Sequence, residues 1–136
     1  MSDQIRLAGV TINAPDALAL ARFYATITGG VATGSAHWAL VEGPNGSMGF
    51  QQVDDFRPPV WPEGDVPMHI HLDFFVDELA ATEARVLAAG ATRFDFQPNS
   101  DHCTVYADPV GHPFCLSTWE APVLARTTSP TSATGA

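Results

Sequence analysis

Two stretches with the same pattern decide the fold. Residues 16–29 read DALALARFYATITG, and residues 77–90 read DELAATEARVLAAG. Each stretch begins with an aspartate, a residue type that caps helices, and carries apolar residues at helical spacing. Each also ends at a glycine, Gly29 or Gly90, thirteen positions after the aspartate (16 to 29 and 77 to 90). The sequence therefore predicts two helices that belong to an internal repeat of about 60 residues.

Strands are predicted around each helix, from runs of apolar and β-branched residues. The predicted strands are residues 5–13, 36–42 and 47–53 around the first helix, and 68–76, 102–107 and 113–118 around the second. The order strand, helix, strands therefore occurs twice. We expect an α+β fold of two tandem βαβββ modules, at about residues 5–54 and 68–119, which form a curved sheet with both helices outside.

Length and composition indicate one globular domain. The chain has 136 residues, of which 46% are hydrophobic and 15% charged, so it has enough apolar surface to bury a core. We expect residues 1–120 to form this domain. Residues 121–136 are mostly small and polar, and we expect them to form a flexible C-terminal tail.

Charge and cysteine content restrict the partners and the location. A net charge of −9 repels phosphate backbones and anionic lipid, so neither nucleic acid nor a membrane is an expected partner. No apolar run approaches the ~20 residues that cross a bilayer, and the first ten residues do not resemble a secretory signal. Cys103 and Cys115 are too few for a disulfide framework and fit a reducing compartment. We expect a cytoplasmic protein.

Alternation in residues 68–76 (MHIHLDFFV) predicts which side chains line a groove. Side chains of a strand point alternately to its two faces, and the apolar set that contains Leu72 and Phe74 must pack under a helix. His69, His71 and Asp73 then share the opposite face, together with Phe75. The same reasoning places Gly9, Gln51 and Cys115 on the groove face of their strands. It also places His102 and Tyr106 together on one face, and we suggest that this face lines the groove.

The chain resembles the vicinal oxygen chelate superfamily, which includes glyoxalase I, extradiol dioxygenases and bleomycin-resistance proteins, and it is most similar to the small glyoxalase-like group. The residues that carry the resemblance are 21–24 (ARFY) with Gly29, 49–53 (GFQQV), Trp61-Pro62, 71–73 (HLD), Gly90-Ala91 and 108–116 (DPVGHPFCL). Their order and spacing extend from about Ile5 to Trp119. Membership of this superfamily implies the two-module fold but leaves the function open.

The resemblance also implies four positions at which metal-dependent members hold a metal ion. Those positions fall here on Gly9, Gln51, His71 and Cys115. Glycine has no ligand atom, and a soft thiol stands where the metalloenzymes have a hard carboxylate that also serves as base. We therefore expect no catalytic metal and no other cofactor, although His71 with Cys115 could hold Zn²⁺ weakly.

His71 is the main candidate site residue. It is either a ligand-contacting or acid/base group, and thus the candidate catalytic residue, or a histidine in the pocket wall. His69 lies two residues earlier and is a candidate rim residue. Asp73 could orient His71 across the i, i+2 spacing of about 7 Å only through water or a ligand, and otherwise it is a solvated carboxylate.

The remaining candidates have similar alternatives. Gln51 could contact a ligand through its amide. Cys115 is either a buried, inert thiol or, if a basic neighbour lowers its pKa, a nucleophile. Cys103 is expected in the core. Trp61 lies in a proline-rich loop and is a candidate lid or dimer contact.

Two functions of different kinds remain. The first is a protein that binds a small aromatic or weakly polar organic ligand in the groove between the modules, through His71, Gln51, Cys115, Asp73, His69 and Trp61, without a complete metal site. The second is an enzyme of lyase, isomerase or dioxygenase type, metal-free or with an atypical metal site, in which His71 is the acid/base or a ligand. The resemblance also implies a homodimer.

Overall fold

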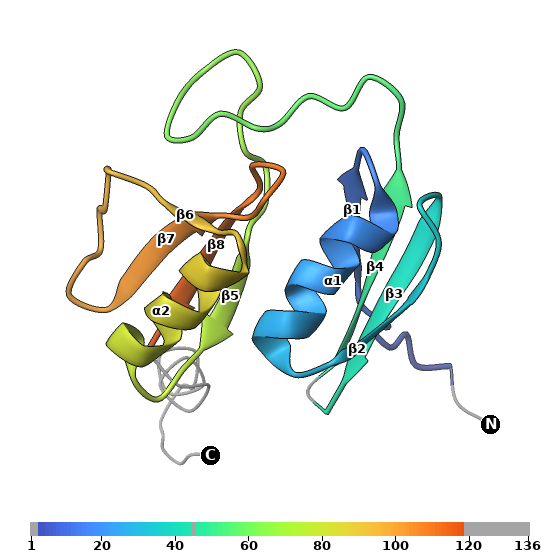
Figure 1. Ribbon diagram of the computed structural model, residues 1–136, viewed down its shortest axis with the longest axis horizontal. Coiled ribbons are helices and arrows are strands. Elements are labelled where there is room, and N and C mark those ends of the chain that lie inside the picture. Colours follow the sequence, from blue (N-terminus) through green and yellow to red (C-terminus); the bar gives the residue numbers. More distant parts are fainter. Residues whose placement is uncertain (1–2, 45, 119–136) are drawn as a thin grey trace. The chain divides into compact units, whose positions relative to one another are not determined.

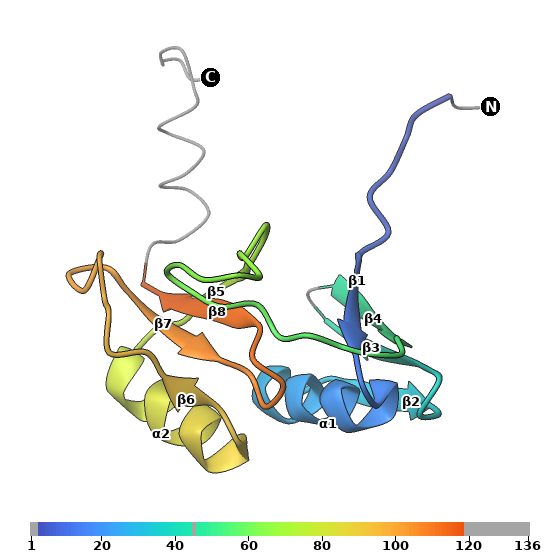
Figure 2. The same cartoon turned by 90° about the horizontal axis from the view of Figure 1, so that it is seen from above.

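A computed structural model describes residues 3–44 and 46–118. The expected C-terminal tail lies outside these residues. The chain divides into two compact units, with the boundary between Pro58 and Pro59, which we call unit 1 and unit 2. Each unit is one βαβββ module with a four-stranded sheet (Figures 1 and 2). A search of the described residues for a helix with the length and hydropathy of a membrane span found none.

Unit 1 contains one helix and four strands. They are β1 (Val10–Ala14), α1 (Ala17–Thr28), β2 (Val31–Gly34), β3 (Trp38–Gly43) and β4 (Gly46–Gln52). The strand order in the sheet is β1-β4-β3-β2; β1 runs parallel to β4, and the other neighbours are antiparallel. α1 packs against β2, β3 and β4.

The ends of α1 are fixed by the two residues that the sequence singles out. The Asp16 carboxylate accepts a hydrogen bond of 3.0 Å from the backbone N–H of Ala19, which satisfies a free donor of the first turn. Gly29 ends the helix in the left-handed conformation, with φ of 78°. Between these ends Tyr24 is fully buried and stacks on Phe50 of β4. The helix predicted at residues 16–29 is confirmed.

Unit 2 repeats the arrangement of unit 1. Its elements are β5 (Leu72–Phe75), α2 (Leu79–Ala89), β6 (Thr92–Arg93), β7 (Cys103–Ala107) and β8 (Pro113–Ser117). The strand order β5-β8-β7-β6 matches that of unit 1, with β5 parallel to β8 and the other pairs antiparallel. The two βαβββ modules predicted from the repeat are therefore confirmed. The strand ranges assigned from the sequence account for three strands of each module; the fourth is the short strand directly after the helix, β2 in unit 1 and β6 in unit 2.

Two strands begin later than predicted, because the parallel strands that they pair with also begin late. β1 begins at Val10 rather than at residue 5, since its partner β4 begins at Gly46 and residues 5–7 extend past that end. β5 spans only Leu72–Phe75, since its partner β8 begins at Pro113, beside the residue that precedes Leu72. Ile70 alternates with Leu72 and Phe74 in the predicted strand and was expected to be buried under the helix with them, but it is 74% exposed.

The core of unit 2 lies between its sheet and α2. The N-cap of α2 is Glu78, whose carboxylate accepts from the backbone N–H groups of Ala80 and Ala81; the predicted start at Asp77 was one residue early. Tyr106 stacks on Phe114, and its hydroxyl donates a 2.8 Å hydrogen bond to Glu83 of α2. Tyr106 therefore faces the helix, and the suggestion that it lines the groove was wrong.

Candidate ligand-binding site

A pocket of about 320 Å³ lies in unit 2, on the face of the sheet that carries the odd-numbered side chains of β5, β7 and β8. Three strands and two loop segments contribute to it. Its lining residues are Trp61, Met68, His71, Asp73, Phe75, Pro98, Asn99, Cys103, Val105, Pro113, Cys115 and Ser117. Because α2 covers the opposite face, where Tyr106 contacts Glu83, the sheet separates the pocket from the helix.

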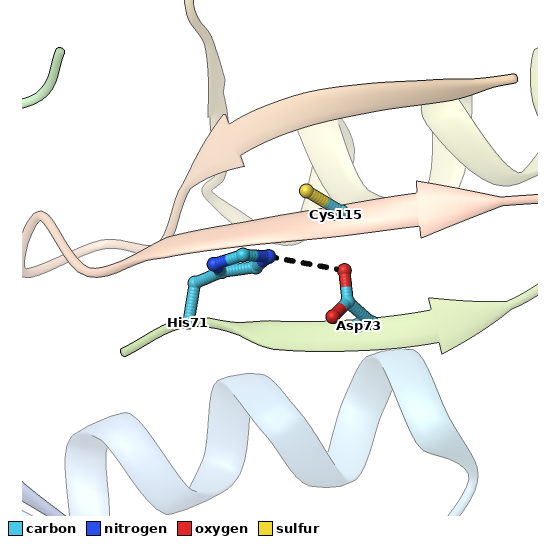
Figure 3. Close-up of side chains that lie close together, drawn as sticks. All are labelled: His71, Asp73 and Cys115. Carbon is cyan, nitrogen blue, oxygen red and sulfur yellow. Dashed lines mark hydrogen bonds and ion pairs between the residues drawn. The ribbon is translucent and has the colours of Figure 1, made fainter. Parts of the chain in front are cut away.

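The polar part of the pocket is a hydrogen-bonded pair. The Nε2 atom of His71 lies 3.1 Å from Oδ1 of Asp73 (Figure 3). The sequence correctly placed both residues on one face, but the expectation that only water or a ligand could join them was wrong. His71 lies just before the first residue of β5, and side chains lean along the strand direction, so the two groups meet although their Cα atoms are two residues apart.

This contact determines which nitrogen of His71 can accept a proton. An ionised carboxylate only accepts hydrogen bonds, so Nε2 carries the proton that it donates to Asp73. In a neutral imidazole the other nitrogen, Nδ1, then has the free lone pair. Figure 3 shows that this second nitrogen points away from Asp73. His71 therefore combines an oriented ring with a basic atom that the pair does not use.

Cys115 lies beside this pair in the pocket wall. It is opposite Asp73 in the β5–β8 register and opposite Val105 in the β7–β8 register. Burial raises the pKa of the Cys115 thiol to about 12, and the negative charge of Asp73 adds to the shift. A nucleophilic cysteine needs a lowered pKa. Cys115 is therefore a protonated, apolar part of the wall, and the nucleophile hypothesis is not supported.

Trp61 belongs to the aromatic part of the site. Its ring contacts Phe94, with ring centres 5.0 Å apart, and Phe96, with ring centres 5.5 Å apart. The loop before β5 is thus attached to the segment that follows β6. The sequence identified Trp61 as a candidate lid or dimer contact, but it gave no signal for the two phenylalanines, which are distant in the chain.

Other expected site residues have different positions. His69 is exposed and does not line the pocket. Gln51 belongs to unit 1, where its amide donates a 2.8 Å hydrogen bond to Oδ1 of Asn13. Cys103 was expected in the core, but it is half-buried and lines the pocket beside Val105, two residues along β7. Alternation along β7 and β8 was the signal that could have identified Cys103, Val105 and Ser117 together.

Comparison with known proteins identifies the family. A family model described as "Glyoxalase-like domain" matches residues 9–117, which include every helix and strand of both modules. The chain belongs to the glyoxalase-like domain family. This family is part of the vicinal oxygen chelate superfamily that the sequence motifs indicated. A search of curated proteins found no match.

Solved structures of the same fold have low sequence identity to the chain. A glyoxalase/bleomycin resistance protein/dioxygenase family enzyme from Burkholderia phytofirmans PsJN is 19% identical, with a TM-score of 0.61 over 80% of this chain and 94% of that one. A possible glyoxalase from Bacillus cereus is 12% identical, with a TM-score of 0.62 over 84% and 99%. Fosfomycin resistance protein FosX from Mesorhizobium loti is 15% identical, with a TM-score of 0.62 over 90% and 97%. At these identities the matches establish the fold.

The metal site of the superfamily's metalloenzymes does not fit this chain. At Gly9 an added Cβ atom would lie 2.6 Å from the backbone carbonyl oxygen of Ser47, so no ligand-bearing side chain fits there. Gln51 offers a neutral amide, and Cys115 offers a soft thiol in place of a hard carboxylate. Asp73 offers a potential metal ligand that the four positions do not include. Potential ligand atoms of His71, Asp73 and Cys115 lie within 4.8 Å of one another. That set has only one carboxylate.

Proposed function

We propose that the pocket of unit 2 binds a small aromatic or weakly polar organic molecule, without a catalytic metal or other cofactor. The observation that carries the proposal is the composition of the wall. Its polar side chains are the hydrogen-bonded pair of His71 and Asp73 together with Asn99 and Ser117, and the other lining side chains are aromatic, aliphatic or thiol. Such a wall is typical of organic-ligand sites, where apolar surface supplies affinity and a few polar groups supply orientation.

The size of the pocket and its polar pair suggest how a ligand is held. A volume of about 320 Å³ is at the small end of the range of ligand sites, so it suits one or two rings. Trp61 and Phe75 offer aromatic surface for a planar ring. The free nitrogen of His71 can accept a hydrogen bond from a hydroxyl or N–H group of the ligand. Asp73 keeps the imidazole in the orientation that this contact requires.

Binding is tested with two planar probes, indole and 2-naphthol, by saturation-transfer NMR. Cys103→Phe fills the pocket and is expected to abolish the transfer, whereas the matched Cys103→Ser retains it. His71→Ala is expected to weaken 2-naphthol binding by roughly 1–3 kcal/mol, the effect of an unpaired polar group. Far-UV circular dichroism and the unfolding midpoint confirm that each variant is folded, and Trp61→Ala replaces Cys103→Phe if the latter is not. Binding that none of these substitutions weakens would refute the proposal.

A second candidate function is favoured by the His71–Asp73 pair. A carboxylate that fixes the tautomer of an imidazole is a common arrangement for a general base, and it suits a metal-free isomerase or lyase that removes a proton next to a carbonyl. The test is deuterium exchange of the CH₂ protons of 2-hydroxyacetophenone in D₂O, followed by ¹H NMR. Exchange that wild type accelerates and His71→Ala does not would favour the enzyme over the binding protein.

Assembly and location belong to the same proposal. We infer a homodimer, since the resemblance to the superfamily implies pairing, and light scattering at high micromolar concentration tests it: a monomer mass refutes the inference. Both cysteines are free thiols, which supports the expected cytoplasmic location. A small organic molecule is the expected partner, and neither nucleic acid nor membrane is.

A further inference from the structure

The charged groups around the pocket are almost all of one sign. Asp73 is the only residue among the lining residues with a permanent charge, and no arginine or lysine is among them. The described part of unit 2 contains two arginines and nine acidic residues, a net charge of −7. A pocket in such a unit concentrates cations and repels anions, because the charges of the whole unit add at the surface.

The two arginines in the described part of unit 2 are placed where they cannot neutralise the pocket. The Arg93 guanidinium forms an ion pair of 2.9 Å with Glu83, a residue of α2. Arg85 belongs to α2 itself, on the face of the sheet opposite the pocket. No arginine of the described part of unit 2, and no lysine, is therefore available to hold a phosphate, phosphonate or carboxylate group in this pocket.

Aromatic rings stand in the same pocket as the carboxylate. Trp61 and Phe75 both line it, and Phe75 is 44% exposed. The face of an aromatic ring attracts a cation within about 6 Å of its centre, most strongly for tryptophan. A carboxylate together with ring faces is the combination that holds an alkylammonium group, because one supplies the opposite charge and the others supply a cation-attracting apolar surface.

We propose that the pocket is selective for cationic ligands, specifically small aromatic molecules that carry an ammonium group, and that Asp73 is the residue that sets this selectivity. The inference rests on the proposed function, since it names the ligand class of the same site. The ring of the ligand lies against Trp61 and Phe75, and its ammonium group lies at the Asp73 carboxylate. An anionic ligand of the same size is excluded by the same carboxylate.

The experiment uses three probes of matched shape on the full chain. Phenyltrimethylammonium carries a permanent positive charge, tert-butylbenzene is its neutral isostere, and benzenesulfonate is a matched anion. Dissociation constants come from saturation-transfer NMR titrations at low and high salt. We expect the cation to bind about five- to tenfold more tightly than the neutral isostere at low salt, with the anion weakest, and we expect salt to reduce the difference.

Two variants assign the selectivity to Asp73. Asp73→Asn is expected to reduce the preference for the cation to less than twofold. Asp95→Asn changes the net charge equally at an exposed residue that does not line the pocket, and it should leave the preference intact. Equal binding of the cation and the neutral isostere in wild type would overturn the inference but leave the proposed function standing. Failure of all three probes, and of indole, to bind would overturn both.

Discussion

Cys115 should resist alkylation far more than an ordinary cysteine. Iodoacetamide reacts with the thiolate, and burial together with the charge of Asp73 raises the pKa of this thiol from its ordinary value of 9.0 to about 12. This difference of about three units in the pKa makes the thiolate fraction of Cys115 at pH 8 about a thousandfold smaller in the folded than in the unfolded protein. Cys115 is also only 6% exposed, which restricts the reagent further.

The rate is measured at pH 8 by digestion and mass spectrometry of the peptide that contains Cys115. The reference is the same peptide alkylated in guanidinium chloride at the same pH. Asp73→Asn removes the negative charge but not the burial, and burial is the larger cause, so this variant should recover only part of the thousandfold difference. Alkylation of Cys115 in the folded wild type within tenfold of the unfolded reference would refute the reasoning.

The same shift predicts a loss of stability in alkaline solution. The folded-state pKa of Cys115 lies above that of the unfolded state, so its contribution is complete below pH 9 and is lost as the pH rises from 9 towards 12. In this window the unfolded chain releases the thiol proton while the folded chain keeps it. The free energy of unfolding should fall by at most about 4 kcal/mol. Cys115→Ala should lack this component in denaturant unfolding measured at pH 8 and pH 10.

Two substitutions away from the pocket test the packing of unit 2. The side-chain amide of Gln97 bonds both the N–H and the carbonyl of Val105, so Gln97→Ala should lower the free energy of unfolding by about 2–3 kcal/mol, measured by urea denaturation; a loss below 0.5 kcal/mol would contradict this. The Glu83 carboxylate accepts from Tyr106 and Arg93, so Glu83→Ala should lower the unfolding midpoint, with a cost of about 1–3 kcal/mol. Glu83→Gln should recover most of it, because the amide oxygen still accepts from Tyr106, and equal loss in both variants would show that the hydroxyl bond matters little.

The helices and their repeat were predictable because their signals are local. The carboxylate of Asp16 reaches an N–H group three residues away, and Gly29 adopts its left-handed conformation without help from distant residues. The start of α2 was predicted one residue early because Asp77 and Glu78 are adjacent acids, and the pattern does not distinguish which of them caps the helix. β6, with two residues, was missed because a short strand is stabilised by its pairing partner rather than by its own pattern.

The site was only partly predictable because its composition depends on pairing and packing. Strand alternation placed His71 and Asp73 on one face, but only the register of β5 with β8 brings Cys115 beside them. The orientation of Tyr106 was predicted wrongly because alternation places His102 and Tyr106 on one face without determining which face of the sheet that is. In the structure the Tyr106 hydroxyl donates to Glu83 of α2, on the helix side. Pro98 and Asn99 line the pocket from a turn whose position no sequence pattern gives.

The central claim is that the His71 pocket is an organic-ligand site rather than a metal centre, and metal content tests it most directly. Protein purified without chelator is analysed by inductively coupled plasma mass spectrometry, beside His71→Ala prepared in the same way. We expect well under one equivalent of zinc, nickel or iron per chain in both proteins, and the same low content after dialysis against Zn²⁺ followed by buffer. About one metal ion per wild-type chain, lost in His71→Ala, would contradict the claim and favour a metalloenzyme with an atypical ligand set.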